Sequence, residues 1–476
     1  MKKLAAFLLG LALLASAFFG AHRVAAEEET RHVRVRLSTG SARAVTLDMT
    51  GDYRCNGTTF TGGTVRLERS GNGVRVVHDT LGTLSDNAFV YLERRPTGEA
   101  EACFSLDNTR YGTCSYLGDL YACVDGSGAL CLVNYVTMEH YLRGVLSGEL
   151  NDTTPFEALK AQAVAARGYA LSCLGAAGAY DLGDDPGDQV YKGYRPEDRA
   201  IAAAVREVDG RTLLLDGEPI KCYYCTGNGG QTLTPAMCWG AANASDAAYD
   251  LRFDPYDVAG SDGAVVLGFT PDASGWPEAA AAFLLRQARR QDARVAEVLG
   301  MTALTGYHDA ENHAGSARSP RTLAPQAWAV AQLTVRLEDG TEASMACGFA
   351  PEALLAEGVA VCEGANVWFV YEQADGAAPF RLVFGRAVGH RVGMSHRGML
   401  EMARQGFAYE EILAFYYPNA TLSPGTAAAP AQATPAQATP APTPTPTPYE
   451  LRVVAPSAAA SGGARSVWDA LLGWLL

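Results

Sequence analysis

The segment from Glu139 to Gly175 places the strongest constraint on how this chain folds, because a turn carrying one carboxylate precedes a well-marked helix. Thr154 suits the N-cap and Pro155 the first helical position, while Glu157 lies three residues after the cap, as in a capping box. Apolar residues then recur at steps of three and four, which predicts a helix with one apolar face.

Two cations lie on another face of this predicted helix. Lys160 and Arg167 are seven residues apart, which is two helical turns, and mainly small alanines surround them. Glu149, just upstream, is expected to point toward them, so that one acid and two bases line one surface. Glu139, near the same turn, is the rival carboxylate. The alternative is that Glu149 pairs with Lys160 in a stabilising role.

The composition is that of a globular protein. The 476 residues are 48% hydrophobic and 19% charged, which is enough for two or three domains with sizeable cores. The formal net charge of −14 argues against a general binder of nucleic acid or anionic lipid, so no nucleic-acid partner is expected.

The N-terminus has the pattern of an export signal. Lys2 and Lys3 precede an apolar run from Leu4 to Gly20, and small residues suited to cleavage follow. Residues 1–26 are therefore predicted to be a signal peptide. A retained N-terminal anchor is the alternative, because the apolar run approaches the length that spans a bilayer. Either prediction places the protein outside the cytoplasm, secreted or anchored to the membrane.

The eleven cysteines raise the questions of disulfides and metals. Export favours disulfides, and the cluster between Cys103 and Cys131 is the place where we expect them. Cys222, Cys225 and Cys238 include a C-x-x-C spacing that invites redox or zinc interpretations, but no fourth ligand lies at zinc-site spacing. His308 and His313 are two histidines without a fixed third ligand. We therefore expect neither a metal nor a cofactor.

The order of patterns predicts an α+β fold with a substrate cleft formed by several loops. Residues 27–134 read as strands and turns, and a mixed helix and strand domain follows over 135–423, with a less distinctive insertion at about 241–380. A Pro/Thr/Ala-rich tract at 424–448 is predicted to be a linker, and 449–476 a tail with a short apolar segment. Within the mixed domain, helices are expected over 196–208, 276–299, 399–405 and 409–415, and a hairpin over 212–224.

Two glycine-rich runs stand out in the mixed domain. They are T-G-N-G-G-Q-T at 226–232 and G-H-R-V-G-M-S-H-R-G at 389–398. Such runs cost backbone entropy on folding. Close approach of the backbone to a ligand is one explanation, and a plain loop is the other.

Several motifs in order resemble the SpoIID/LytB family, whose type member is stage II sporulation protein D. They are Y-L-R-G-V-L-S-G-E-L, P-F-E-A-L-K-A-Q-A-V-A-A-R-G-Y-A-L, Q-V-Y-K-G and the two glycine-rich runs, between about Tyr135 and Leu422. The resemblance implies a lytic transglycosylase that cuts peptidoglycan glycan strands stripped of their stem peptides. It also implies a cell-wall amidase and membrane sporulation proteins as candidate partners.

The resemblance also implies roles for residues. Glu149 is similar to the family's catalytic acid, and the motif residues expected to bind substrate are Lys160, Arg167, Gln189, Tyr191, Tyr223, Tyr224, Gly229, Gly230, His390 and Ser395. A lytic transglycosylase needs one carboxylate where ordinary glycosidases need two. Burial should raise the pKa of that acid. Because nearby cations would lower it, we assign Lys160 and Arg167 to substrate oxygens or carboxylates.

The sequence departs from the family pattern at three positions. Arg391 and His396 replace a glycine and a glutamine of the late motif, and Gly148 stands where the family often has serine. These changes bear on substrate detail more than on reaction class. Three alternatives stay open: His390 as a hydrogen-bonded loop histidine, a non-catalytic amidase enhancer of the same family, and a structural surface protein with a Pro-rich spacer.

Overall fold

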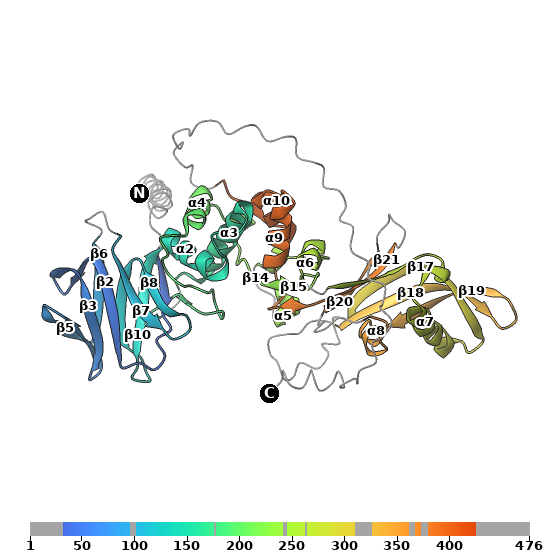
Figure 1. The fold of residues 1–476 in the computed structure, drawn as a ribbon, viewed down its shortest axis with the longest axis horizontal. Coiled ribbons are helices and arrows are strands. Elements are labelled where there is room, and N and C mark those ends of the chain that lie inside the picture. Colours follow the sequence, from blue (N-terminus) through green and yellow to red (C-terminus); the bar gives the residue numbers. More distant parts are fainter. Residues whose placement is uncertain are drawn as a thin grey trace, which may run out of the picture. The chain divides into compact units, whose positions relative to one another are not determined.

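The computed structural model describes residues 32–95, 101–175, 178–240, 245–261, 264–309, 326–360, 367–372 and 379–424. The predicted signal or anchor, His313, Cys362, the C-terminal tail and all but the first residue of the predicted linker lie outside these residues. The chain divides into two compact units (Figure 1). The first runs to Cys222 and includes the segment from Thr421, and the second runs from Tyr223 to Ala420. The predicted α+β class is confirmed.

An eleven-stranded sheet dominates the first unit. Its main path has the order β11-β1-β10-β9-β6-β2-β3-β4-β5, with β7 pairing to both β2 and β8, and only the β1–β11 pairing is parallel. The strands are β1 (His32–Arg36), β2 (Ala44–Cys55), β3 (Thr58–Ser70), β4 (Gly73–His78), β5 (Gly82–Asn87), β6 (Phe89–Arg95), β7 (Cys103–Asn108), β8 (Gly112–Tyr116), β9 (Asp119–Val124), β10 (Leu130–Thr137) and β11 (Leu182–Gly183). The predicted boundary at 134 falls inside β10.

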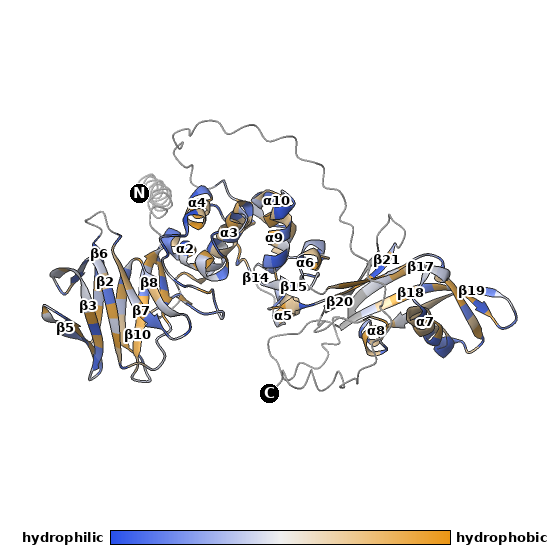
Figure 2. Ribbon diagram, in the orientation of Figure 1, coloured by the Kyte–Doolittle hydropathy of each residue, from blue (hydrophilic) through white to orange (hydrophobic). Residues whose placement is uncertain are grey.

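Side chains along the strands of this sheet alternate between buried and more exposed positions. In β1, Val33 and Val35 are fully buried while the residues between them are not, and β9 alternates in the same way. Figure 2 shows the mixture of orange and blue residues along these strands. A period of two is what a strand with one buried face requires, so the predicted β-rich region is confirmed.

Three helices and a small sheet complete the first unit. The helices are α2 (Met138–Glu149), α3 (Phe156–Cys173) and α4 (Arg199–Glu207), and the small sheet joins β12 (Leu213–Leu215), β13 (Glu218–Pro219) and β24 (Thr421–Leu422). The predicted hairpin is present in a shorter form as β12–β13, whose second strand is Glu218–Pro219 and not the predicted Ile220–Tyr224.

The prediction of one apolar face on α3 is wrong. Every residue from Ala158 to Ala170 is buried, because α2, α4 and the β12–β13 hairpin pack around the helix. Small residues permit this close approach: a Cβ on Gly168 would lie 2.5 Å from the Cys222 sulfur. The helix is therefore the centre of its unit and not an amphipathic surface helix.

The predicted start of α3 is also wrong by one residue. Pro155 is the N-cap, without a side-chain hydrogen bond, while the Thr154 hydroxyl accepts from the Asn151 amide at 3.4 Å. Glu157 pairs with Lys160 at 2.6 Å, so a competing ion pair engages the carboxylate expected to close a capping box.

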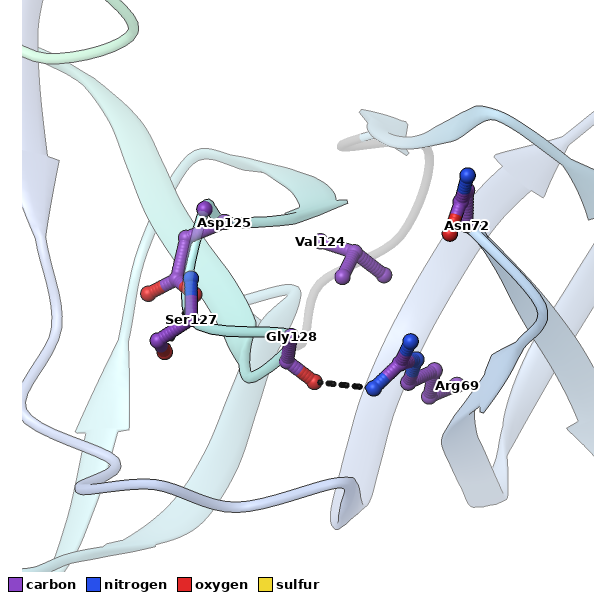
Figure 3. Close-up of a pocket in the computed structure, with 7 residues that line it drawn as sticks. Arg69, Asn72, Val124, Asp125, Ser127 and Gly128 are labelled. Atoms are coloured by element: carbon purple, nitrogen blue, oxygen red, sulfur yellow. Dashed lines mark hydrogen bonds between the residues drawn. The ribbon is translucent and has the colours of Figure 1, made fainter.

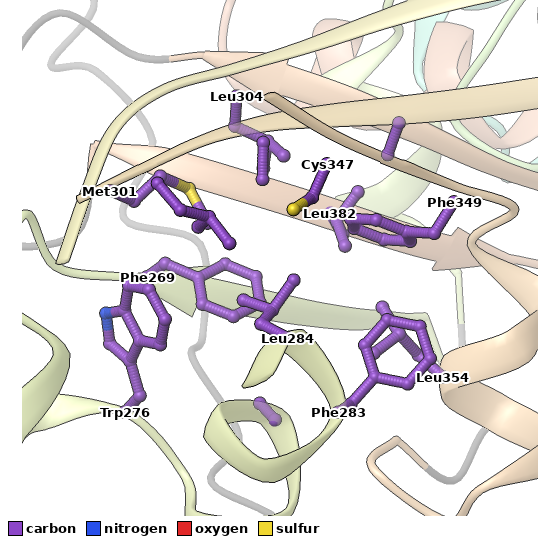
Figure 4. Close-up of a cluster of buried hydrophobic side chains, with 14 of the residues drawn as sticks. Phe269, Trp276, Phe283, Leu284, Met301, Leu304, Cys347, Phe349, Leu354 and Leu382 are labelled. Atoms are coloured by element: carbon purple, nitrogen blue, oxygen red, sulfur yellow. The ribbon is translucent and has the colours of Figure 1, made fainter. Parts of the chain in front are cut away.

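Much of the second unit is a β-rich layer with its own core. One sheet joins β16 (Val265–Phe269), β21 (Phe380–Gly385) and β20 (Val367–Glu372), and another joins β17 (Val295–Asp309), β18 (Gln326–Leu337) and β19 (Glu342–Phe349). Helices α7 (Glu278–Gln291) and α8 (Glu352–Ala356) contribute to the same hydrophobic cluster. Figure 4 shows Phe269, Phe283 and Leu382 converging in it.

The helix predicted over 276–299 is too long. It ends at Gln291, and β17 begins at Val295 because the residues from there pair antiparallel with β18. Val295 and Val298, which were expected to extend the helix, are buried in the same hydrophobic cluster as its side chains. Tertiary pairing has overridden the local helical pattern.

The remaining elements of the second unit hold the two glycine-rich motifs together. The helices are α5 (Pro235–Trp239), α6 (Pro255–Ala259), α9 (His396–Arg404) and α10 (Tyr409–Tyr416), with short 3-10 turns at Asp246–Ala248 and Ala273–Gly275. Strand β14 (Tyr224–Cys225) pairs with β23 (Met394–Ser395), and β15 (Gly227–Asn228) pairs with β22 (Ala387–Val388).

Helix α9 starts three residues before the predicted 399, because the Ser395 hydroxyl caps it by accepting from the Gly398 amide. Helix α4 starts at Arg199 and not at 196, and the Asp152 carboxylate accepts from the Ile201 amide in its first turn. Helix α10 matches its prediction to within one residue. In the described part of the chain, no helix has the length and apolar character to cross a membrane.

Candidate active site

Glu149 is the last residue of α2, so the prediction that it lies in a turn is wrong, and the residue is partly exposed. One oxygen, Oε1, accepts a hydrogen bond from the Val190 amide at 3.1 Å. Burial raises the pKa of Glu149, while this hydrogen bond and the nearby Lys192 cation lower it by less. The negative end of the α2 dipole also disfavours a carboxylate at this position. The group is therefore biased toward the protonated form that a general acid needs.

Glu139 lies at the other end of the same helix. Ten residues at 1.5 Å per residue separate it from Glu149 by about 15 Å along the helix axis. The two carboxyl groups therefore cannot serve as the pair that an ordinary glycosidase uses.

The extended segment from Gln189 to Tyr194 holds Glu149 in place. Burial alternates along it: Gln189, Tyr191 and Gly193 are buried, and the residues between them are partly exposed. The Tyr141 hydroxyl donates to Gln189 Oε1 at 2.9 Å, and the Tyr191 hydroxyl donates to Asn134 Oδ1 at 2.8 Å. Gln189 and Tyr191 are only 1% exposed, so their contacts here anchor the segment. Substrate binding by them stays a prediction.

Two glycines of α2 allow this segment to lie against the helix. A Cβ on Gly144 would come within 2.3 Å of the Tyr191 ring, and a Cβ on Gly148 within 2.5 Å of the Val190 carbonyl oxygen. Gly148, where the family often has serine, therefore fits the close approach that brings the Val190 amide to Glu149.

Lys160 and Arg167 have partners inside the protein. Lys160 Nζ lies 2.6 Å from Glu157 and 3.2 Å from Glu207. Arg167 Nη1 donates to the carbonyl oxygens of Val208 and Arg211, just after α4, at 2.7 and 2.8 Å. Burial lowers the pKa of Arg167 to about 10, so it stays charged at neutral pH.

These contacts fasten α3 to the end of α4. The cation whose charge acts on Glu149 is Lys192, which the sequence patterns did not single out. Glu149, Lys160 and Arg167 were expected to line one surface, but the contacts of the two cations lie with other residues. Substrate binding by Lys160 and Arg167 stays a prediction.

The second unit brings the other predicted site residues together. Pairing of β14 with β23 sets Tyr224 beside Met394 and Cys225 beside Ser395. Gly229 and Gly230 have φ of 74° and 97°, and a Cβ on Gly385 would lie 1.9 Å from the Gly229 carbonyl oxygen. The close backbone approach at these glycines is thus to the protein's own strand β21.

His390 is a hydrogen-bonded loop histidine. Its Nδ1 accepts from the Val392 amide at 3.0 Å, and it also hydrogen-bonds to the backbone of Tyr224. Burial lowers its pKa to about 4, so the ring is neutral at physiological pH. The ring packs on Tyr223 and Trp239, with centroids 6.0 and 5.2 Å apart. This geometry favours the loop-histidine alternative.

A buried pair of acids, Asp254 and Asp257, organises the second unit, and the sequence patterns did not single it out. Asp254 Oδ2 accepts from Asn228 Nδ2 at 2.7 Å and from the Tyr416 hydroxyl at 2.8 Å. Asp257 Oδ1 accepts from the Asn228 amide and from the Ser395 hydroxyl. The signal was present: Asp254-Pro255 is an N-cap followed by proline at the first helical position.

This pair predicts a pH-dependent stability. Burial and the Asp257 charge raise the pKa of Asp254 to about 6, against an ordinary value near 4. The folded state therefore holds a proton that the unfolded state has released, and this contribution to stability is present below about pH 4 and lost as pH rises through about 6. Asp257→Asn should flatten the fall in the free energy of unfolding between these pH values by about 1–2 kcal/mol.

Thermal or denaturant unfolding at several pH values measures the effect. Asp216→Asn, the same change in an exposed turn, is the matched control and should leave the wild-type pH profile intact. If the free energy of unfolding falls equally with pH in wild type and Asp257→Asn, the Asp257 charge does not raise the pKa of Asp254.

The two departures in the late motif have structural explanations. Arg391 has φ of 66°, the left-handed region where glycine is the default residue, which accounts for the family's glycine. Its Nη2 donates to Gln231 Oε1 at 3.3 Å. His396 is buried at the start of α9 and stacks on Tyr224 with centroids 5.4 Å apart.

Cys103, Cys114, Cys123 and Cys131 are free thiols, so the disulfides expected among them are not formed in this structure. Burial raises the pKa of Cys225 to about 12 and that of Cys238 to about 11, which disfavours the thiolate form needed for metal binding or redox attack. Among the residues that the structure describes, no group of three or more His, Cys, Asp or Glu has the arrangement of a metal site.

An open polar pocket lies elsewhere in the first unit, between two turns of the large sheet (Figure 3). Arg69, Asn72, Asp125 and Ser127 line it, and Arg69 Nη1 donates to the Gly128 carbonyl oxygen at 3.1 Å. None of the predicted site residues belongs to this pocket.

The structure thus gathers the predicted site residues into two groups. The first unit holds Glu149, Lys160, Arg167, Gln189 and Tyr191, and the second holds Tyr223, Tyr224, Gly229, Gly230, His390 and Ser395. That both groups line one cleft stays a prediction.

Residues 126–214 match the family model for SpoIID, described as stage II sporulation protein, and this range contains Glu149 and the segment that holds it. This region of the chain is similar to the SpoIID family. The resemblance read from the motifs is confirmed, and the matched SpoIID region lies within the first unit.

Two relatives extend the comparison. An uncharacterised protein of Brachyspira hyodysenteriae (strain ATCC 49526 / WA1) is 31% identical over 172 residues, which are 36% of this chain and 45% of the relative. The amidase enhancer of Bacillus subtilis (strain 168) is 25% identical over 293 residues, which are 59% of this chain and 40% of the relative. The alignments thus span less than half the length of each relative.

Proposed function

We propose that this protein is an extracytoplasmic lytic transglycosylase that cleaves peptidoglycan glycan strands, with Glu149 as its single acid and base. The observation that carries the proposal is the Glu149 carboxyl at the end of α2, whose pKa burial raises and to which the Val190 amide donates a hydrogen bond. The match of residues 126–214 to the SpoIID family model and the N-terminal signal pattern support a role at the cell wall.

A single carboxyl group suffices for this reaction. Protonated Glu149 donates its proton to the glycosidic oxygen as the bond from that oxygen to C1 breaks. The resulting carboxylate takes the proton of the C6 hydroxyl of the same sugar while O6 bonds to C1. Glu149 is thereby protonated again and no water is consumed. The product ends in a 1,6-anhydro ring.

Three aspartates of the same unit already accept hydrogen bonds from other parts of the protein. This favours a one-carboxylate mechanism over hydrolysis. Asp152 accepts from the first turn of α4, Asp198 accepts from the Ser147 hydroxyl, and Asp188 accepts from the Gly183 amide. Each of these carboxylates is engaged in holding the fold around α2.

A second candidate function is that of a non-catalytic amidase enhancer, favoured by the name of the Bacillus subtilis relative. One experiment separates the two. The purified full chain is incubated with glycan strands whose stem peptides have been removed, and the products are analysed by mass spectrometry.

We expect fragments with 1,6-anhydro ends, each lighter by one water than the hydrolysed fragment. Fragments with ordinary reducing ends would replace the transglycosylase with a hydrolase. Intact strands, together with faster stem-peptide release when an amidase is added, would establish the enhancer.

A further inference from the structure

Lys192 lies on the open side of the segment that holds Glu149. Burial alternates from Gln189 to Tyr194, so Val190, Lys192 and Tyr194 share the partly exposed side of the extended chain. Val190 donates to the Glu149 carboxylate, and the Lys192 charge acts on the same carboxyl group. The ammonium is therefore a neighbour of the proposed general acid.

The position of Lys192 is fixed on both sides. Its own amide donates to the Gly144 carbonyl oxygen at 3.2 Å, and the Tyr194 amide donates to the Ser115 carbonyl oxygen at 2.6 Å. Between them, Gly193 has φ of 75°, and a Cβ there would come within 2.1 Å of the Ser115 carbonyl oxygen. Helix α2 and strand β8 thus clamp the backbone that carries the lysine.

An aromatic ring from the N-terminal β-rich region lies under the ammonium. Tyr111, in the turn between β7 and β8, has its ring centroid 5.4 Å from Lys192 Nζ. The Tyr111 hydroxyl donates to the Asp184 carbonyl oxygen at 3.0 Å, which fixes the ring, and the side chain stays partly exposed. The ring therefore lies beside the Lys192 ammonium.

Lys192 differs from the two cations expected to bind substrate. Lys160 lies between Glu157 and Glu207, whereas Lys192 forms no ion pair with any side chain that the structure describes. An ammonium without an ion-pair partner is available to an anionic ligand. A ring face beside it offers apolar contact to a sugar.

We propose that Lys192 and Tyr111 form a subsite that binds a sugar carrying a free carboxylate, in contact with the glycan bond presented to Glu149. This inference rests on the proposed function. In peptidoglycan, such a carboxylate is the lactyl group of muramic acid once its stem peptide has been removed. The subsite predicts a preference for stripped strands and makes the N-terminal β-rich region a part of the active site.

Binding measured in the Glu149→Gln background tests the subsite without cleavage of the ligand. The probes are glycan strands stripped of stem peptides and chitin oligosaccharides of equal length, which carry no carboxylate. Lys192→Met should weaken binding of the stripped strands roughly 10- to 100-fold, the range of one lost charge-assisted hydrogen bond, and leave chitin binding within about twofold. Lys192→Arg should restore most of the preference.

Lys221→Met is the matched control, because Lys221 Nζ lies 4.5 Å from the ring centroid of Tyr169 in the same kind of cation–π contact. It should leave the affinities for both probes unchanged. Equal affinity of Lys192→Met and its parent for stripped strands would overturn the subsite while leaving the proposed function intact. Absence of binding to either probe in the Glu149→Gln parent would overturn both.

Discussion

Glu149→Gln is expected to lower the rate of glycan cleavage by roughly 10²- to 10⁴-fold, the usual contribution of a general acid or base. The amide has no proton of suitable acidity to give to the glycosidic oxygen. Its oxygen still accepts from the Val190 amide, so the fold around the end of α2 should persist. Release of anhydro ends, followed over time at equal protein concentrations, measures the loss.

The matched control for this variant is Glu139→Gln. It makes the same chemical change on the same helix, about 15 Å away along the axis. Cleavage by this control should stay within about twofold of wild type, and its thermal unfolding should resemble that of Glu149→Gln. Undiminished cleavage by Glu149→Gln would remove this residue from the mechanism.

Gly148→Ala is expected to have the second-largest effect. The added methyl group would come within 2.5 Å of the Val190 carbonyl oxygen, closer than side-chain carbons approach backbone, so the Val190 segment must move away from α2. That movement lengthens the bond from the Val190 amide to Glu149. We expect a loss of cleavage of roughly 10- to 100-fold and a destabilisation of about 1–3 kcal/mol.

Gly126→Ala provides the comparison for this prediction. A Cβ at Gly126 meets no atom within 4 Å, and its φ is not positive, so the substitution should change neither cleavage nor unfolding. Wild-type cleavage by Gly148→Ala would mean that the contact between α2 and the Val190 segment does not set the geometry of Glu149.

Local patterns predicted a substantial part of this structure. The alternation of apolar residues indicated the β-rich region, and turn residues indicated the β12–β13 hairpin. The sequence singled out Glu149, but the helix that ends at this residue, α2, was predicted as a turn.

Features that depend on contacts distant in sequence were not predicted. Helix α3 is buried all round because three other elements pack on it, and no single-segment pattern encodes that. Lys160 and Arg167 share a helix face, yet acids and carbonyl groups of α4 and the residues after it engage them. Tyr111 and Lys192 meet only because β8 and the Gln189–Tyr194 segment lie side by side.

The most direct test of the central claim is a crystal structure of the Glu149→Gln variant with a bound fragment of a stripped glycan strand. The account predicts the side-chain amide of residue 149 within about 2.6–3.2 Å of a glycosidic oxygen. It also predicts the lactyl carboxylate of the neighbouring sugar at Lys192. A glycan bound elsewhere on the protein, with no glycosidic oxygen near residue 149, would contradict it.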